Sequence, residues 1–79
     1  HTAMTVSFAE QASIFCSQQS QYPDLQVFIE KVLKQDPRPS YKKQREGEQS
    51  YGMTLYNYNI KWTVNGEHNH VTEIHQLPG

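Results

Sequence analysis

Residues 22–39, YPDLQVFIEKVLKQDPRP, decide the fold because they contain the clearest helix of the chain and the point where it ends. Pro23 is well tolerated at the first position of a helix, and a residue before proline, here Asp36, is pushed out of the helical region. We therefore predict an amphipathic helix from Pro23 to Asp36. Its apolar residues recur at the spacings of three and four that define one helical face: Leu25, Phe28, Ile29, Val32 and Leu33.

A second amphipathic helix is predicted upstream of this stretch. Ser7-Phe8-Ala9-Glu10 fits a capping box, in which the Ser7 hydroxyl accepts a hydrogen bond from the Glu10 backbone N–H and the Glu10 carboxylate reaches back. This helix should end near residues 19–21, and its apolar stripe is Phe8, Ala12, Phe15 and Cys16. Residues 1–5 carry no pattern, so we interpret them as an expression-vector remnant and expect one domain over residues 6–77.

Downstream of Ser50 the apolar period changes from 3.6 to 2, which is typical of β-strands. Two runs alternate in this way: Tyr51, Met53 and Leu55, then Ile60, Trp62 and Val64. Asn65-Gly66 is a strong hairpin signal, and a third, less regular strand is expected over about residues 69–75. We therefore predict an α+β fold in which two N-terminal helices pack on a three-stranded antiparallel β-meander, in two layers.

The whole chain has 79 residues and a net charge of −1, so its length predicts one domain and its charge favours no class of partner. A domain this small has little room for a buried cofactor pocket, and we predict no catalytic residues, no metal and no activity for it alone. No apolar run reaches the length of a membrane span, and no signal sequence opens the chain. Cys16, the only cysteine, is expected in the core, and the lack of disulfides favours a reducing, cytoplasmic setting.

The histidines and the tyrosines near a predicted turn each allow two interpretations. His68 and His70 share a strand face, and His75 lies on the other unless a bulge intervenes. Structural zinc usually takes four ligands, often thiolates, so we interpret these histidines as exposed strand residues rather than a metal site. Tyr56 and Tyr58 could stack on nucleic-acid bases, but packing within the protein is the preferred interpretation.

The candidate functional site is the segment that follows the predicted helix, from Asp36 to Arg45. Pro37 and Pro39 hold Arg38 on a stiff backbone, where Asp36 can orient it or cap backbone N–H groups. Four of the seven Lys and Arg residues fall within these positions: Arg38, Lys42, Lys43 and Arg45. With Tyr41, they suit the binding of a phosphate backbone and a stacked base. The alternative is a stapled turn with a solvated, basic loop.

From about Val6 to Leu77, the chain resembles the C-terminal domain of the TrmO family, also called YaeB or TsaA-like proteins, which are bacterial tRNA adenine-N6-methyltransferases. The most specific string is Gln35-Asp36-Pro37-Arg38-Pro39-x-Tyr41. Further matches lie in order on both sides of it: Tyr22-Pro23-x-Leu25, Phe28-Ile29-x-x-Val32-Leu33, Tyr51, Leu55, Asn59 and Trp62-x-Val64. The segment from Lys42 to Gln49 and the third strand match less well.

The resemblance implies a parent protein whose N-terminal β-barrel binds S-adenosylmethionine and methylates N6 of threonylcarbamoyladenosine next to the anticodon of a tRNA. This chain would be an accessory domain without a cofactor of its own, which helps tRNA binding or completes the active site. Its partners would be the anticodon region, the barrel and a second copy in a homodimer, with no membrane. The residues expected to act are Asp36, Pro37, Arg38, Pro39, Tyr41, Lys42, Lys43 and Arg45. The alternative is a structural docking or dimer-supporting module with no direct RNA contact.

Overall fold

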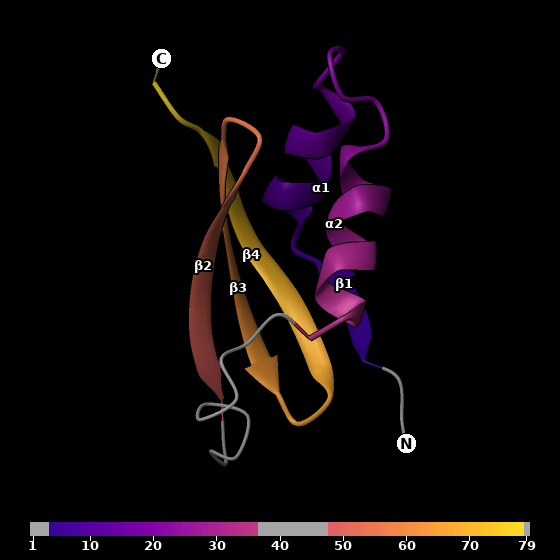
Figure 1. The fold of residues 1–79 in the computed structure, drawn as a ribbon, viewed down its shortest axis with the longest axis vertical. Helices are drawn as coiled ribbons and strands as arrows, with labels where there is room; N and C mark the ends of the chain where they lie inside the picture. Colours follow the sequence, from indigo (N-terminus) through magenta and orange to yellow (C-terminus); the bar gives the residue numbers. More distant parts are fainter. Residues whose placement is uncertain (1–3, 37–47, 79) are drawn as a thin grey trace.

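The computed structural model describes residues 4–36 and 48–78, which form one four-stranded sheet and two helices (Figure 1). In chain order the elements are β1 (Thr5–Phe8), α1 (Glu10–Ser17), α2 (Leu25–Lys34), β2 (Gln49–Leu55), β3 (Tyr58–Asn65) and β4 (His68–Gln76). The strands lie in the order β1-β4-β3-β2. Strands β2, β3 and β4 are antiparallel neighbours, whereas β1 pairs with β4 in parallel. Among the described residues, neither helix is long and apolar enough to span a membrane.

The prediction of a three-stranded antiparallel meander is therefore wrong, because β1 adds a fourth, parallel strand to the sheet. Thr5 pairs with His68 and Phe8 with Val71, at opposite ends of the chain. The capping-box interpretation of Ser7 is also wrong, since Ser7 lies within β1 and Ala9 occupies the N-cap without a side-chain hydrogen bond. A strand of four residues is too short to show a period of 2.

Helix α2 confirms the amphipathic helix predicted from the sequence. Leu25, Ile29 and Leu33 follow one another at intervals of four residues, and all three are buried. Phe28, which the sequence also assigns to the core, remains 38% exposed at the edge of this stripe. The helix ends as the following proline predicts: Asp36 adopts a left-handed φ of +56°, and its backbone N–H donates to the Leu33 carbonyl at 3.0 Å.

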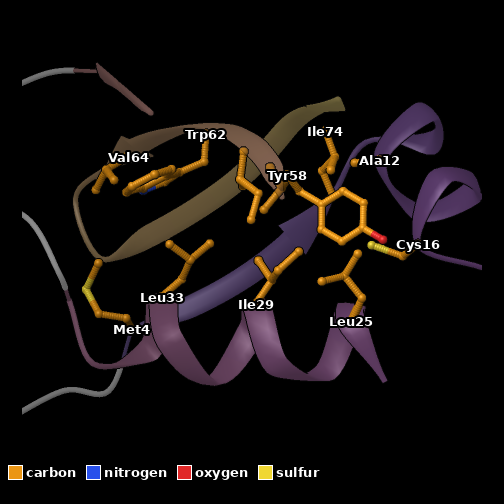
Figure 2. Packing of buried hydrophobic residues seen from close by; sticks show 12 residues of the cluster. Met4, Ala12, Cys16, Leu25, Ile29, Leu33, Tyr58, Trp62, Val64 and Ile74 are labelled. Carbon is orange, nitrogen blue, oxygen red and sulfur yellow. The ribbon is translucent and has the colours of Figure 1, made fainter. Parts of the chain in front are cut away.

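The core lies between the helices and one face of the sheet (Figure 2). In Figure 2, α2 directs its buried side chains toward strand β3, and Cys16 reaches the same layer from α1. The buried apolar residues are Met4, Ala12, Cys16, Leu25, Ile29, Leu33, Tyr58, Ile60, Trp62, Val64, Val71 and Ile74. Asn69 is the buried polar side chain of the described residues, and its Nδ2 donates to the Thr5 carbonyl at 3.2 Å. This bond ties β1 to β4 from within the core.

A β-bulge in β4 explains the irregular alternation of its sequence. Trp62 pairs with Val71 and the preceding Lys61 pairs with Glu73, so Thr72 is the extra residue. Its Oγ1 donates to the Lys61 carbonyl at 3.1 Å. Because of the extra residue, both Val71 and Ile74 point into the core.

The Asn65-Gly66 hairpin signal is confirmed between β3 and β4. β3 ends at Asn65 and β4 begins at His68, so the connection is short. Gly66 has a φ of +62°, a left-handed conformation that residues with a side chain rarely adopt.

Candidate nucleic-acid interface

Of the eight predicted site residues, the structure describes Asp36. It is partly buried and lies at the capped end of α2, where the Gln35 backbone N–H also donates to the Val32 carbonyl at 3.2 Å. These bonds fix the point from which the chain leaves the helix. The other seven lie outside the described residues: Pro37, Arg38, Pro39, Tyr41, Lys42, Lys43 and Arg45. Their predicted roles stay predictions.

The face of the sheet away from the helices is polar, and we call it the open face. The bulge at Thr72 places all three strand histidines on it, because Asn59 pairs with His75 and Thr63 with His70. The sequence predicted that His75 would share a face with His68 and His70 only if a bulge intervened, and the bulge at Thr72 meets that condition. The open face carries these side chains from three strands: Thr5, Ser7, Asn59, Lys61, Thr63, His68, His70, Glu73 and His75.

Four of these side chains form a continuous hydrogen-bonded chain, which we call the histidine chain: Thr5, His68, Ser7 and His70. The Thr5 Oγ1 lies 2.7 Å from His68 Nδ1, and the Ser7 Oγ lies 2.9 Å from His68 Nε2 and 2.7 Å from His70 Nδ1. The Ser7 hydroxyl has one proton and two lone pairs, so it donates to at most one of the two ring nitrogens and accepts from the other, and the tautomers of His68 and His70 set the directions. Parallel pairing of β1 with β4 is what brings these groups together.

The histidine chain shows no metal geometry. Within the described parts of the sequence, no three His, Cys, Asp or Glu side chains come together as metal ligands. Farther along β4, the His75 Nε2 lies 2.5 Å from the Glu73 carboxylate. This hydrogen bond lowers the pKa of Glu73 from its ordinary value, and the charge of Lys61 acts in the same direction. The open face therefore offers hydrogen-bonding groups of both kinds and at least one cation.

A second surface feature lies where the N-terminal end of α2 meets the β2–β3 turn. Tyr22 stacks on Tyr56 with ring centroids 4.1 Å apart and an angle of 11° between the rings. Phe28 also packs against Tyr56, at 5.4 Å and 30°. We call Tyr22, Phe28 and Tyr56 the aromatic cluster. Tyr58, by contrast, is buried and meets Phe15 and Tyr22 edge-on, so the structure separates the two tyrosines that the sequence left together.

Sequence reasoning named Tyr56 as a residue that could stack on bases but missed its partners in the aromatic cluster. Tyr22 and Phe28 precede Tyr56 by about thirty positions, and only the packing of α2 against the hairpin brings them together. The one signal in the sequence was the proximity of Tyr56 to a turn. Beside the rings lies an open cavity with a volume of about 370 Å³.

Cys16 lies in the core of the domain as a free thiol. Its side chain is buried, and burial raises the pKa of its thiol to about 11 from an ordinary 9.0. The thiol is therefore protonated at neutral pH, and little of it is present as the thiolate, the form that acts as a nucleophile or metal ligand. This agrees with the prediction of a small core residue.

The geometry defines a two-layer α+β domain with a mixed four-stranded sheet and a polar open face. A search of protein families matches residues 1–77 to the TrmO C-terminal domain, so the chain belongs to the TrmO C-terminal domain family. A relative from Escherichia coli (strain K12), a tRNA (adenine(37)-N6)-methyltransferase, is 42% identical over 62 residues, which cover 77% of this chain and 26% of that protein. The chain thus spans about a quarter of the length of this relative.

The same fold occurs in a chain from the crystal structure of the archaeal RelE–RelB complex from Pyrococcus horikoshii OT3. The two structures superimpose with a TM-score of 0.70 and cover 95% of this chain and 96% of that one. Their sequences are 17% identical, so the similarity concerns the fold alone.

Proposed function

We propose that this chain is an accessory domain of a tRNA (adenine-N6)-methyltransferase that helps to bind the tRNA or completes the active site. The observation that carries the proposal is membership in the TrmO C-terminal domain family. The methyl donor, S-adenosylmethionine, would bind in an N-terminal β-barrel of the parent protein, and this domain would contribute no cofactor. The substrate would be threonylcarbamoyladenosine next to the anticodon, and the parent a homodimer in the bacterial cytoplasm.

The end of α2 supports a role for the segment that starts at Asp36. Because the helix is closed by backbone hydrogen bonds to Val32 and Leu33, the segment begins at a fixed position. In the proposal, Arg38 contacts a phosphate or the modified base, and Asp36 orients it. Tyr41 stacks on a base or donates a hydrogen bond to it. Two prolines stiffen this part of the chain, and three cations attract the anticodon stem: Pro37, Pro39, Lys42, Lys43 and Arg45.

A second candidate function is docking against the barrel or a second subunit without contact to RNA. Such a contact could cover two exposed apolar side chains on the helices, Ile14 and Val27, which are 48% and 51% exposed. In this candidate the Asp36 segment packs against protein. Substitution of Asp36 or Arg38 would then change assembly or melting, and charge reversal of Lys42 and Lys43 would leave tRNA affinity unchanged.

The test of the first proposal is tRNA methylation by the full-length parent carrying Arg38→Ala. We expect lower methylation at unchanged oligomeric state. Lys34→Ala is a matched control, because Lys34 is a surface cation near the same helix end that pairs with Glu30 at 2.9 Å. Methylation that equals the wild type in Arg38→Ala would contradict the role assigned to Arg38.

A binding measurement separates the two candidate functions. An anticodon stem-loop is titrated into this 79-residue domain at two salt concentrations. We expect weak binding that falls with salt, and in Lys42→Ala/Lys43→Ala a slope of log K against log salt that is shallower by about 2. An affinity that changes neither with salt nor in Lys42→Ala/Lys43→Ala would favour the docking function.

A further inference from the structure

We infer that the aromatic cluster is a stacking site for one unpaired nucleobase of a bound RNA, with a preference for purines. The inference rests on the proposed function, since it adds a base contact to an RNA-binding domain. It concerns Tyr22, Phe28 and Tyr56, which lie on the described part of the chain and outside the Asp36–Arg45 segment.

The geometry of the three rings favours stacking of a further flat ring. Tyr56 already stacks nearly parallel on Tyr22, yet 54% of its surface is exposed to solvent. A large aromatic surface of this kind, held by its neighbours, loses little conformational freedom when another flat ring stacks on it. Aromatic side chains stack on bases in this way in proteins that bind unpaired RNA.

The cavity next to these rings has room for a base. Its volume of about 370 Å³ lies in the range of small-molecule sites, and its apolar wall comes from Pro23, Leu25 and Val27. Polar groups stand in the lining as well, namely Gln21, Asp24 and Lys31. The edge of a base carries hydrogen-bond donors and acceptors, which these amide, carboxylate and ammonium groups match.

Lys31 adds a positive charge to the lining of the cavity. Within the described residues Lys31 makes no ion pair, whereas Lys34, one turn along α2, is paired with Glu30. An unpaired ammonium group beside the cavity suits the phosphate that accompanies a stacked base. A wholly aliphatic protein partner would gain nothing from this group.

The backbone of Tyr56 adopts an unusual conformation. Its φ is +56°, in the left-handed region where glycine is favoured and a residue with a side chain is strained. Tyr56 also opens the short connection between β2 and β3, where glycine or asparagine would fit without strain. A strained tyrosine at the rim of a cavity is better explained by the use of its ring than by the demands of the turn.

The test compares two RNA probes on this domain. The probes are fluorescently labelled heptaadenylate and an abasic heptanucleotide with the same number of phosphates. We expect heptaadenylate to bind roughly 5- to 100-fold more tightly, the range that stacking of one base supplies. Heptauridylate, whose rings are smaller, should lie between the two.

Tyr56→Gly removes the ring and also relieves the strained φ, so the variant should melt close to the wild type. We expect it to bind heptaadenylate as weakly as the abasic probe. Tyr56→Phe keeps the ring and should keep the affinity. Ile14→Ala is a matched control, because Ile14 is similarly exposed but lies on α1, outside the aromatic cluster.

Three results would overturn the inference. Equal affinity for the adenylate and abasic probes would contradict the stacking site but not the proposed RNA-binding function. Absence of binding to either probe would contradict both the stacking site and the RNA-binding function. If Tyr56→Gly kept full affinity for heptaadenylate but weakened assembly of the full-length parent, the aromatic cluster would be a protein-docking surface.

Discussion

The aromatic cluster and the histidine chain both present rings at the surface, but they are positioned by different forces. Tyr22, Phe28 and Tyr56 are held by ring packing between a helix and a turn. His68 and His70 are held by hydrogen bonds to two hydroxyls of β1. Packing depends on the core beneath and is insensitive to pH, whereas a hydrogen-bonded imidazole depends on its proton. The two surfaces should therefore respond to different perturbations.

The largest expected effect on stability comes from Leu25→Ala, which removes a buried side chain next to the aromatic cluster. Leu25 is fully buried and also lines the cavity next to Tyr56. Loss of its side chain should lower the free energy of unfolding by about 2–5 kcal/mol, measured by urea denaturation. Leu77→Ala, at an exposed residue, is the control. A loss below about 1 kcal/mol would show that the packing of Leu25 contributes little to the stability of the fold.

The next effect is the protection of the Cys16 thiol, which lies in the core on the side of α1. With a pKa of about 11, its thiolate fraction at pH 8 is about 100-fold lower than that of an ordinary thiol. Iodoacetamide should label the native protein at least that much more slowly than the unfolded chain. The raised pKa also links stability to pH. The folded state holds the Cys16 proton more tightly than the unfolded chain, so its contribution to the free energy of unfolding is fully present below pH 9.0 and is lost as the pH rises towards 11. Rapid labelling of the native protein at pH 8 would contradict this.

A smaller effect is expected at the histidine chain. Ser7→Ala removes the hydroxyl that bridges His68 and His70 and should cost about 1 kcal/mol. In a domain of this size that corresponds to a fall in Tm of roughly 4–8 °C. Thr54→Ala is the control, because Thr54 is an exposed residue of β2. Equal melting of the two variants would show that the hydrogen bonds contribute little, and the aromatic cluster should be unchanged in both.

The smallest effect concerns Glu73 and His75. Since the folded pKa of Glu73 lies below its ordinary 4.5, the pair stabilises the fold above that pH, and the contribution is lost as the pH falls through the lower value. Thermal melts of the wild type and Glu73→Gln should differ slightly near pH 6 and converge once the pH has fallen below the lowered pKa of Glu73. NMR titration of His75→Ala should show the pKa of Glu73 closer to 4.5. An unchanged value would contradict the stated cause.

Part of this fold could be predicted from the sequence because its signals are local. The period of α2, the alternation of β2 and β3 and the turn at Gly66 all depend on neighbours within a few positions, and all three are confirmed. β1 could not be predicted, because four residues carry no period and the strand is stabilised by β4, more than sixty positions away. The histidine chain could not be predicted for the same reason, because its hydrogen bonds join β1 to β4 across the same separation in sequence.

The candidate site divides in the same way. The Asp36–Arg45 segment could be singled out because its prolines and cations are contiguous, and its roles remain predictions. The aromatic cluster could not, because Phe28 falls on the predicted core face of α2 and its neighbour Tyr56 comes from a distant hairpin. What a side chain meets at the edge of a core depends on where the next element packs.

The bulge at Thr72 also has a consequence for comparing this chain with its relatives. A single extra residue reverses the parity of every later position in β4, so that even-numbered Ile74 takes the inward place that odd-numbered Val71 holds before it. Deleting Thr72 would leave the pairs Trp62–Val71 and Lys61–Glu73 consecutive, with each side chain on its present face. A relative that is one residue shorter at this point can therefore share the whole sheet. If the two chains were aligned without a gap there, inward residues would be matched to outward ones.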